Sequence, residues 1–361
     1  MKILLTITTL AMGGAETQVM NLADSFASRG YSVKVAYLLQ PAVVMPKHDQ
    51  VELIWLGGDK SIASMYTAFK NLIGLIKVWQ PDVVHSHMFH PNILSRLARV
   101  FSKTPRLICT AHNTHEGGKL RMLAYRLTDF IADEFTNVSQ EAVQAFEDKK
   151  AAPKGTMLAT HNGIDVDHFT FDSNSRNSIR QQYDLDNKKV FIAIGRFHEQ
   201  KDYPNLLTAF QSLVSTQPDA RLLIVGDGDL RPVIEQSIKE LKLTERVTLL
   251  GIRNDIPALL SASDVFVLSS AFEGFGLVVA EAMAVERIAI ATDCGGVSEV
   301  VGDEGFLVEP GNSNALAEAM QKALSLSPAD AELLGQRARQ RIVSTYSLKS
   351  VVDKWEVIYD V

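Results

Sequence analysis

Residues 2–30, KILLTITTLAMGGAETQVMNLADSFASRG, contain in order an apolar run, a glycine turn and a helical pattern. The run KILLTIT is short and apolar, which predicts a buried strand. Residues 15–30 carry apolar side chains at helical spacing, and Gly30 is placed to end the helix. A buried strand followed at once by a covering helix predicts a parallel sheet.

This alternation of strand and helix continues along the chain. The first half contains the strand candidates 2–8, 32–39, 51–57, 81–87 and 106–112, and the second half contains 190–196, 221–227, 246–251, 265–270 and 288–293. Apolar strands separated by amphipathic helices predict parallel sheets with helices on both faces, and two such series predict two domains. The predicted fold is α/β, with two Rossmann-like doubly wound domains that face a cleft.

The boundary between the domains is predicted near residue 165. A chain of 361 residues exceeds what one hydrophobic core usually serves. The polar stretch 165–189 has no strand periodicity, which is typical of a domain boundary. We therefore expect one domain at 1–165 and a second at 166–344, followed by an amphipathic helix near the C-terminus.

The composition is that of an ordinary globular protein, with 46% hydrophobic and 22% charged residues. The net charge of −6 gives no argument for a nucleic-acid partner. The two cysteines, Cys109 and Cys294, lie far apart in sequence, which favours a reducing, cytoplasmic location. No run of about 18 apolar residues is present, so any membrane contact is expected to be peripheral.

A glycine turn follows the first predicted strand at Gly13 and Gly14, just before Glu16. Glycines let a backbone approach a ligand closely, and the helix N-terminus that follows favours an anion or a polar substrate. A tight turn that binds nothing explains the same residues equally well. The turn does not match the G-x-G-x-x-G pattern of dinucleotide-binding proteins.

Arg196 and Lys201 follow another predicted strand, in the segment GRFHEQKDY at 195–203. Ligands of doubly wound sheets bind at the carboxyl ends of strands, so both cations are candidates for binding a diphosphate. Arg offers a planar fork of donors and Lys a point charge. A solvated surface pair remains the alternative.

The segment EGFGLVVAE, residues 273–281, has a glutamate at each end. On one continuous helix the two carboxylates would lie about 12 Å apart along the axis. The glycine turn lets Glu273 fold back, while Gly276 and Leu277 begin a helix and offer amides to an anion. The carboxylates would then bind hydroxyl groups of a sugar and a ribose. Glutamates that merely favour a helix N-terminus remain the alternative.

No metal is expected in this protein. Three Asp-x-Asp pairs are interpreted as background in a chain rich in Asp, namely Asp165/Asp167, Asp184/Asp186 and Asp227/Asp229. The histidines His85, His87 and His90 lack the neighbouring cysteines or carboxylates and the spacing of a zinc site. Histidines that line a cleft at strand ends are expected instead, and His112 follows another strand.

Several of these segments occur in the order found in the retaining glycosyltransferases of family 4, which the chain resembles. They are GGAE at 13–16, NGID at 162–165, GRFHEQKDY at 195–203, VGDG at 225–228, EGFGLVVAE at 273–281, and a glycine pair followed by Glu299. The resemblance covers about residues 3 to 310, and a typical C-terminal helix follows. Its most specific element is the pair of glutamates separated by seven residues, with Phe-Gly-Leu between them.

The resemblance implies a GT-B fold, in which the C-terminal domain holds a nucleotide-sugar and the last helix, about 345–361, crosses back to the N-terminal domain. It implies that Arg196 and Lys201 hold the diphosphate and take the place of a metal. Glu273 would contact the transferred sugar, Glu281 would bind the ribose, and His112 would lie near the sugar ring. The other expected binding positions are Gly13, Gly14, Glu16, Asn162, Gly195, Gly226, Phe275, Gly276, Leu277 and Glu299.

The resemblance also implies an activity, that of a metal-independent hexosyltransferase which needs no cofactor and retains the anomeric configuration of its donor. UDP is the nucleotide expected from the family. Cations and helix amides would stabilise the departing diphosphate in a cleft closed by domain motion. Front-face attack, with the leaving phosphate taking the acceptor proton, would account for retention. The expected acceptor is a hydroxyl of a lipid-linked glycan in bacterial surface polysaccharide synthesis.

The region 118–130 predicts a helix that is both basic and apolar. Its charges are Lys119, Arg121 and Arg126, and its apolar side chains are Leu120, Met122, Leu123 and Tyr125. Such a helix could touch a membrane surface that carries a lipid-linked glycan. An amphipathic helix packed on its own domain has the same pattern, so both interpretations stay open.

Two other functions fit a two-domain α/β chain of this kind. One is a nucleotide-sugar epimerase or a phosphorylase of related architecture, and the other is a non-catalytic subunit that binds a nucleotide or a glycan. The glutamate pair together with Arg196 and Lys201 favours sugar transfer over epimerisation. A chain that only binds has no need for all of these positions, which favours an enzyme.

Overall fold

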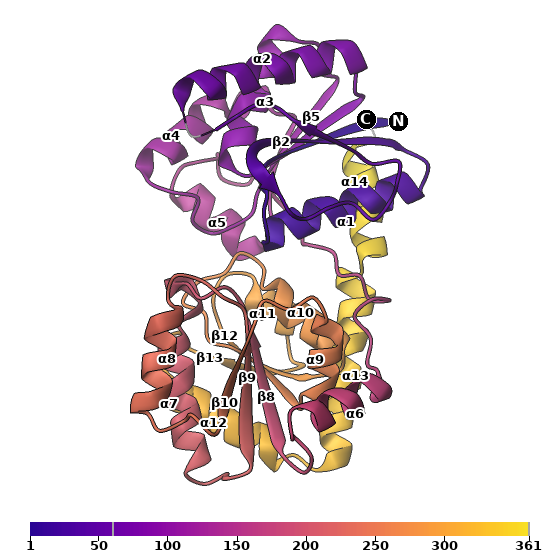
Figure 1. The fold of residues 1–361 in the computed structure, drawn as a ribbon. Coiled ribbons are helices and arrows are strands. Elements are labelled where there is room, and N and C mark those ends of the chain that lie inside the picture. The colour runs from indigo at the N-terminus through magenta and orange to yellow at the C-terminus, as the bar shows by residue number, and fades with distance from the viewer. Residues whose placement is uncertain (60, 360–361) are drawn as a thin grey trace. The chain divides into compact units, whose positions relative to one another are not determined.

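The computed structural model describes residues 1–59 and 61–359, so the last two residues of the expected 345–361 segment lie outside the described residues. The chain forms two compact units (Figure 1). Unit 1 comprises Met1–Gly163 and Leu348–Val361, and unit 2 comprises Ile164–Ser347. The chain enters unit 2 two residues before the expected boundary at 165, and the polar stretch 165–189 lies wholly in unit 2, where it contains helix α6 (Ser173–Gln182).

Unit 1 is built on a seven-stranded sheet in the order β3-β2-β1-β4-β5-β6-β7, and all neighbouring strands are parallel. Its strands are β1 (Lys2–Leu10), β2 (Ser32–Ala42), β3 (Glu52–Trp55), β4 (Val83–His87), β5 (Arg106–Ala111), β6 (Glu134–Asn137) and β7 (Leu158–Ala159). The strand order reverses between β1 and β4. In such sheets, ligands bind outside the carboxyl ends of the strands at this reversal.

Helices cover both faces of the unit 1 sheet, and each face has its own hydrophobic core. The helices are α1 (Gly14–Ser28), α2 (Ile62–Trp79), α3 (Phe89–Phe101), α4 (Lys119–Thr128), the short η1 (Asp129–Ile131), α5 (Gln140–Asp148) and α14 (Leu348–Tyr359). Successive side chains of a strand point to opposite faces, so Ile3 and Leu5 enter the core under α1 while Leu4 enters the other core.

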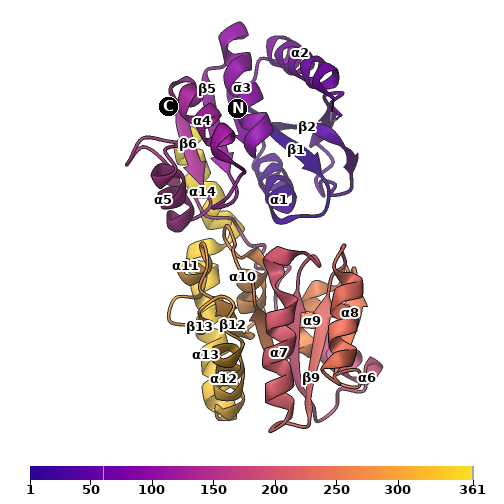
Figure 2. The same ribbon diagram turned by 90° about the vertical axis from the view of Figure 1, so that its left-hand side faces the viewer.

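The last helix of the chain, α14, packs in unit 1 against α1 (Figure 2). Its residues Trp355 and Tyr359 are each 2% exposed and belong to the same core as β1 and α1. Burial of two aromatic side chains of this size gives the helix a strong hydrophobic anchor. The predicted return of the C-terminal helix to the N-terminal domain is confirmed.

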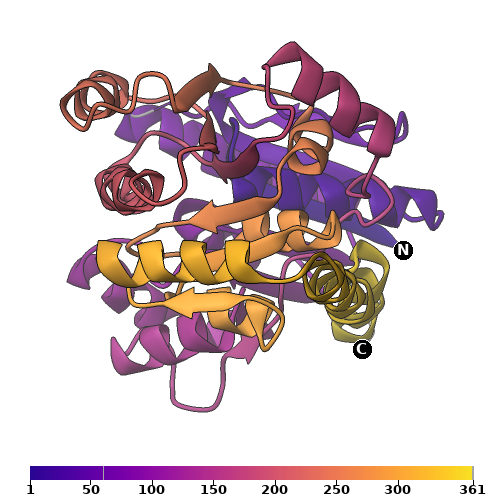
Figure 3. The same ribbon diagram turned by 90° about the horizontal axis from the view of Figure 1, so that it is seen from below.

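Unit 2 has a six-stranded parallel sheet in the order β10-β9-β8-β11-β12-β13. Its strands are β8 (Lys189–Ile194), β9 (Ala220–Val225), β10 (Val247–Gly251), β11 (Val265–Leu268), β12 (Ile288–Thr292) and β13 (Phe306–Val308). Besides α6, its helices are η2 (Glu199–Lys201), α7 (Tyr203–Val214), α8 (Arg231–Glu240), α9 (Ile256–Ala262), α10 (Leu277–Ala284), α11 (Val297–Val301), α12 (Ser313–Ser325), α13 (Pro328–Arg341) and η3 (Ile342–Tyr346). The gold helix beside the strands in Figure 3 is α12, which contacts β12 and β13.

Two parallel, helix-covered sheets confirm the predicted α/β class, and all ten predicted strands are present. Three strands were missed, namely β6, β7 and β13, which are four, two and three residues long. β7 and β13 contain too few residues to show an apolar pattern, and β6, EFTN, contains a single apolar residue.

Candidate active site

Arg196, Lys201 and Glu273 lie on two segments that leave the unit 2 sheet where its strand order reverses. β8 ends at Ile194 and leads into the segment that contains Arg196 and Lys201. β11 ends at Leu268 and leads into the segment that contains Glu273. Because β8 and β11 are paired parallel neighbours, both loops emerge at the same edge of the sheet.

Lys201 and Glu273 form an ion pair between these two loops. Lys201 Nζ lies 2.6 Å from Glu273 Oε1, and the side chains are 17% and 10% exposed. Ser270 Oγ donates a second hydrogen bond to the same oxygen at 2.7 Å. A carboxylate with so little access to water needs such partners to remain charged. The candidate cation and the candidate carboxylate therefore share one buried polar centre.

Main-chain contacts join the two loops around this ion pair. The Ala271 N–H donates to the Gln200 carbonyl at 2.8 Å, and Ser269 Oγ donates to the Lys201 carbonyl at 2.7 Å. Gln200 Nε2 donates to the Phe272 carbonyl at 2.9 Å. Sequence reasoning missed these supporting residues and Ser270, because nothing in their spacing shows that segments some 70 positions apart meet.

Two glycines allow neighbouring loops of the site to touch. A Cβ at Gly226 would overlap the Gly195 carbonyl oxygen, and one at Gly295 would overlap the Glu273 carbonyl oxygen. Both glycines also have positive φ values, +138° and +59°, which L-residues with a side chain rarely adopt. The predicted glycine turns therefore serve at least to pack the loops against one another.

Arg196 and Lys201 differ in exposure. The side chain of Arg196 is exposed, whereas that of Lys201 runs across Gly195, where an added Cβ would lie 2.9 Å from Lys201 Cε. Tyr203 Oη donates to the Gly195 carbonyl at 2.8 Å and holds this part of the loop. Arg196 is thus a cation of the rim, while Lys201 belongs to the buried centre.

Helix α10 begins at Leu277, as the glycine turn predicts, with Gly276 as its N-cap. Glu281 lies in the second turn of this helix. Burial raises the pKa of the Glu281 carboxyl to about 8, and Lys201 acts in the opposite direction. Near neutral pH this carboxyl therefore carries a proton, so it offers both a donor and an acceptor.

Two other candidates pack inside unit 2. The ring of Phe275 is buried, and its centroid lies 5.5 Å from that of Tyr346. Tyr346 Oη donates to the Glu299 carbonyl at 2.6 Å. The Phe275 side chain thus supports the loop by packing against Tyr346.

In unit 1 the turn at the end of β1 is the start of helix α1, with Gly13 as N-cap and Gly14 as the first helical residue. The Glu16 carboxylate is 8% exposed and lies against Gly13, where a Cβ would collide with it. Gln18 Oε1 accepts a hydrogen bond from the Gly163 N–H at 3.1 Å. This bond brings the buried Asn162 and its neighbours to the same helix.

His112 follows β5 and is bonded to a histidine at the end of β4. The His112 Nε2 and His87 Nδ1 atoms lie 2.9 Å apart. Burial lowers the pKa of His112 to about 4 and that of His87 well below its usual range. Both rings are therefore neutral at physiological pH.

A carboxyl group four residues after His112 holds the main chain of that residue. Glu116 Oε1 accepts from the His112 N–H at 2.9 Å, and Glu116 Oε2 accepts from Tyr125 Oη at 2.6 Å. Burial raises the pKa of the Glu116 carboxyl. Asn92 Nδ2 in turn donates to Tyr125 Oη at 3.2 Å. Sequence reasoning missed this network, since a polar residue gives no sign from its spacing that it is buried.

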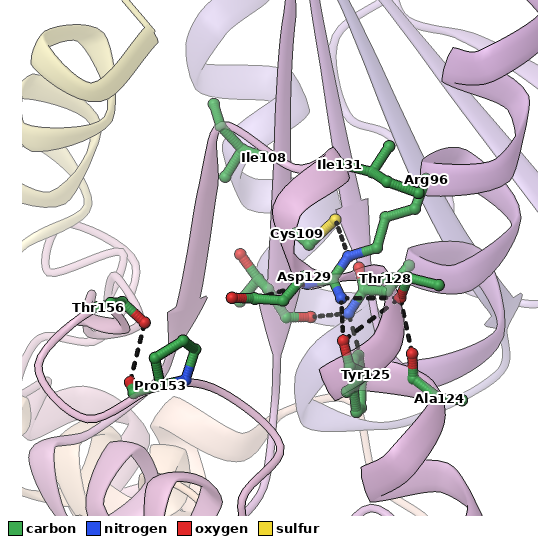
Figure 4. Close-up of polar contacts among 12 residues, drawn as sticks. Arg96, Ile108, Cys109, Ala124, Tyr125, Thr128, Asp129, Ile131, Pro153 and Thr156 are labelled. Carbon is green, nitrogen blue, oxygen red and sulfur yellow. Dashed lines mark hydrogen bonds and ion pairs between the residues drawn. The ribbon is translucent and has the colours of Figure 1, made fainter.

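Arg96 lies on helix α3, and its guanidinium hydrogen-bonds helix α4 in the interior of unit 1 (Figure 4). Arg96 is fully buried, and its Nη1 donates to the Tyr125 carbonyl at 3.0 Å and to Thr128 Oγ1 at 3.1 Å. Its guanidinium carbon also lies 4.5 Å from the ring centroid of Phe135, within cation–π range.

The outer face of α4 and of the turn after it is apolar. Leu120, Leu123, Leu127 and Phe130 are 83%, 51%, 64% and 85% exposed. Their spacing of three, four and three residues places them on one side of a helix. We call these four residues the α4 stripe. Of the apolar residues predicted for this helix, Met122 and Tyr125 face the core and are 5% and 0% exposed.

Within residues 1–59 and 61–359, no cluster of three or more His, Cys, Asp or Glu side chains could hold a metal ion. Over the same ranges, none of the helices combines the length and the apolarity that a membrane span needs. Of the Asp-x-Asp residues, Asp227 is bonded within the protein, since Arg231 Nη1 lies 3.1 Å from its Oδ2 and its Oδ1 accepts from the Gly228 N–H.

Two Rossmann-like units, each with polar groups at the reversal point of its sheet, define the GT-B class of proteins. Family models locate the chain more closely. A Glycosyltransferase Family 4 model matches residues 12–168, and a Glycosyl transferases group 1 model matches residues 175–341. The chain belongs to this glycosyltransferase family, as its ordered motifs predicted.

Characterised relatives span most of the chain. The N-acetyl-alpha-D-glucosaminyl L-malate synthase of Bacillus anthracis is 29% identical over 292 residues, 77% of this chain and 74% of the relative. The UDP-Gal:alpha-D-GlcNAc-diphosphoundecaprenol alpha-1,3-galactosyltransferase of Escherichia coli is 28% identical over 314 residues, 82% and 80% of the two chains. The crystal structure of Anabaena HepE in complex with UDP shares the fold, with a TM-score of 0.88 and 22% identity over all of both chains.

Proposed function

We propose that this glycosyltransferase moves a hexose from a UDP-sugar to a hydroxyl group of a lipid-linked glycan, without a metal and with retention of the anomeric configuration. The observation that carries the proposal is the buried Lys201–Glu273 pair at the reversal point of the unit 2 sheet. At this position the cation can bind the diphosphate of a donor, and the carboxylate can bind its sugar.

The bonding capacity of this pair supports the assignment. A lysine ammonium has three N–H donors, and Lys201 directs one of them to Glu273. The remaining donors can bind phosphate oxygens and stabilise the charge that develops on the leaving diphosphate. The N-terminus of α10 adds main-chain amides near Leu277, and the exposed Arg196 adds a second cation.

The two glutamates suit the two sets of hydroxyl groups on the donor. Among the residues that the structure describes, Oε2 of Glu273 has one long contact, 3.4 Å to Gln200 Nε2, so it retains capacity to accept from a sugar hydroxyl. The carboxyl of Glu281 has a pKa of about 8, so it carries a proton at neutral pH. It can therefore donate and accept a hydrogen bond at the same time, which matches a ribose diol. Retention would follow from front-face attack, in which the leaving phosphate takes the acceptor proton.

The donor and acceptor are inferred from relatives and from the surface of unit 1. HepE was crystallised with UDP, and the Escherichia coli relative is named for UDP-Gal and an undecaprenol diphosphate acceptor. A Campylobacter jejuni relative, 28% identical over 249 residues, is also named for a diphospho-undecaprenol acceptor. The α4 stripe, flanked by the exposed Lys119 and Arg126, suits the surface of an anionic bilayer. We infer a role at the inner face of the cell membrane, in surface polysaccharide synthesis.

A panel of nucleotide sugars tests the reaction. Purified protein should release UDP slowly from one UDP-sugar, and faster when an undecaprenol diphosphate glycan is present. Lys201→Ala should lower this release by roughly a hundredfold to a thousandfold. Lys188→Ala is the matched control, because Lys188 is also ion-paired, at 3.0 Å to Asp219, on the edge of the same unit.

Three results would contradict the proposed reaction. The first is formation of an epimer without an acceptor, and the second is no release of UDP with any donor and acceptor. The third is a rate of UDP release by Lys201→Ala that stays within a fewfold of the wild-type rate. The anomeric configuration of the product, read by NMR, tests retention separately.

Sedimentation with vesicles tests the membrane contact. Wild-type protein should bind vesicles that contain phosphatidylglycerol more strongly than those of phosphatidylcholine alone. Replacing Leu123 and Leu127 by Gln should weaken this binding roughly tenfold or more, since each buried methylene contributes about 0.8 kcal/mol. Leu333→Gln, at a leucine of unit 2 that is 51% exposed, is the control. Equal vesicle binding by the wild type and all variants would contradict the proposed membrane contact of the α4 stripe.

A further inference from the structure

The ring of His87 has one nitrogen with a partner and one without. Its Nδ1 lies 2.9 Å from His112 Nε2. Its Nε2 is a buried atom with no hydrogen-bond partner among residues 1–59 and 61–359, and the residue is 1% exposed. This imbalance decides where the protons of the two histidines lie.

A neutral imidazole has one N–H donor and one acceptor nitrogen. If the proton of His87 were on Nε2, a buried N–H would have no acceptor. Buried N–H groups without a partner are rarer than buried acceptors without a donor. The proton of His87 therefore belongs on Nδ1, from which it is donated to His112 Nε2.

This assignment determines the tautomer of His112. Because its Nε2 accepts, the proton of the neutral His112 ring lies on Nδ1. The side chain of His112 is partly exposed, which leaves Nδ1–H as the group available to a ligand. We infer that His87 is a positioning residue which presents His112 as a hydrogen-bond donor to an oxygen of the substrate. The inference deepens the proposed function and rests on it for the role of His112.

The surroundings of His87 hold its ring in place. The His85 ring packs on it, with centroids 4.0 Å apart. His85 itself is bonded through Nδ1 to Tyr359 Oη at 2.6 Å and through Nε2 to Thr110 Oγ1 at 2.7 Å. Helix α14 thus supports the His85 ring through Tyr359, and the Nδ1 atom of His87 is kept in reach of His112.

The consequence is a specific chemistry for His112. With its acceptor nitrogen occupied by His87, it cannot take a proton from an attacking hydroxyl without breaking that bond. It can only donate, so its ligand is an acceptor oxygen, from a sugar hydroxyl or from the diphosphate.

Nitrogen NMR of histidine-labelled protein tests the assignment in the wild type. The expected signal for His112 is that of a neutral ring protonated on Nδ1, and the same holds for His87. A His112 ring protonated on Nε2, or doubly protonated at neutral pH, overturns the inference. Adding UDP, and then the nucleotide sugar that is active in the donor panel, separates the two oxygen sources. A shift of the Nδ1–H signal with UDP indicates phosphate, a shift only with the sugar donor indicates a sugar hydroxyl, and no shift with either overturns the inference.

Two variants of His87 test the donor by function. The side-chain amide of His87→Asn places an N–H donor where Nδ1 lay, whereas His87→Phe keeps a ring and removes the donor. We expect kcat/KM to fall about tenfold in His87→Phe and less than about threefold in His87→Asn, together with mixed His112 tautomers in the Phe variant. The controls are His90→Asn and His90→Phe, at an exposed histidine.

An Asn variant as weak as the Phe variant would overturn the inference, because packing alone would then explain both losses. Should neither variant fold, the wild-type spectrum still decides the tautomer. Failure of the proposed function is a separate result. In that case no nucleotide sugar would release its nucleotide, whatever proton positions the spectrum shows.

Discussion

The polar centres of the two units differ in charge. In unit 2 an ammonium and a carboxylate meet at 2.6 Å within a buried frame of loop contacts. In unit 1 the corresponding end of the sheet carries two neutral imidazoles, His87 and His112, whose pKa values burial lowers. The unit 2 centre suits a charged diphosphate, while the unit 1 centre suits neutral hydroxyl groups.

The physical reason for this difference is the cost of desolvation. A buried charge is tolerated where an opposite charge and hydrogen-bond donors compensate it, as Lys201 and Ser270 do for Glu273. Among the described residues, no counter-charge is bonded to the ring of His87 or of His112, so these rings stay neutral. The same topological position can therefore serve ionic or neutral chemistry, depending on the partners that the loops supply.

After Lys201→Ala, the largest effect is expected from removing the negative charge of the ion pair. Glu273→Gln leaves Lys201 without its counter-charge and removes the acceptor proposed for the sugar. Turnover in the donor panel should fall roughly a hundredfold. Glu309→Gln, at an exposed glutamate of the same unit, should match the wild type. A Glu273→Gln enzyme within threefold of the wild type would show that the charge of this centre is dispensable.

A smaller effect is expected in the neutral network of unit 1. Tyr125→Phe removes the hydroxyl that donates to Glu116 Oε2 and leaves a buried acceptor unpaired. The free energy of unfolding should fall by about 1–3 kcal/mol, and turnover by about fivefold as the His112 segment loosens. Urea unfolding measures the free energy of unfolding, and the donor panel measures the turnover. Tyr66→Phe, at a tyrosine that is 64% exposed, is the control, and equal stability of both variants would refute the role of this bond.

The pH dependence of stability should depend on Glu281. Its carboxyl holds a proton up to about pH 8 when folded, but only to its ordinary pKa of 4.5 when unfolded. Between these values the folded protein binds more protons, so stability falls as pH rises. Allowing for partial exposure, wild type should lose about 2 kcal/mol more than Glu281→Gln between pH 5 and pH 8. Parallel pH profiles of the two proteins would mean that the carboxyl titrates normally.

The smallest effect is expected from a metal chelator. If the cations of unit 2 stabilise the leaving diphosphate, EDTA should leave the turnover of the wild type unchanged within error. Adding Mg²⁺ or Mn²⁺ back should not raise it. A loss of activity that either ion restores would show that the diphosphate is bridged by a metal rather than held by Lys201 and Arg196.

Part of this molecule could be predicted from local patterns. The ten strands with continuous apolar runs, the covering helices, the start of α10 after Gly276 and the family all follow from apolar periodicity and ordered glycine motifs. These features depend on neighbours in sequence, because a strand or a helix start is determined by a few consecutive residues. The short β7 and β13 were missed for the same reason, since they carry too few residues for a pattern.

The sequence by itself determined the two parallel sheets, the strand ends that carry polar residues, and the identity of the candidate cation and carboxylates. Only the tertiary structure decided that Lys201 and not Arg196 pairs with Glu273, that the Phe275 ring packs on Tyr346, and that His87 is bonded to His112. These contacts join segments from different strands, and their strength depends on burial. Burial is a property of the packed chain, so no local pattern can display it.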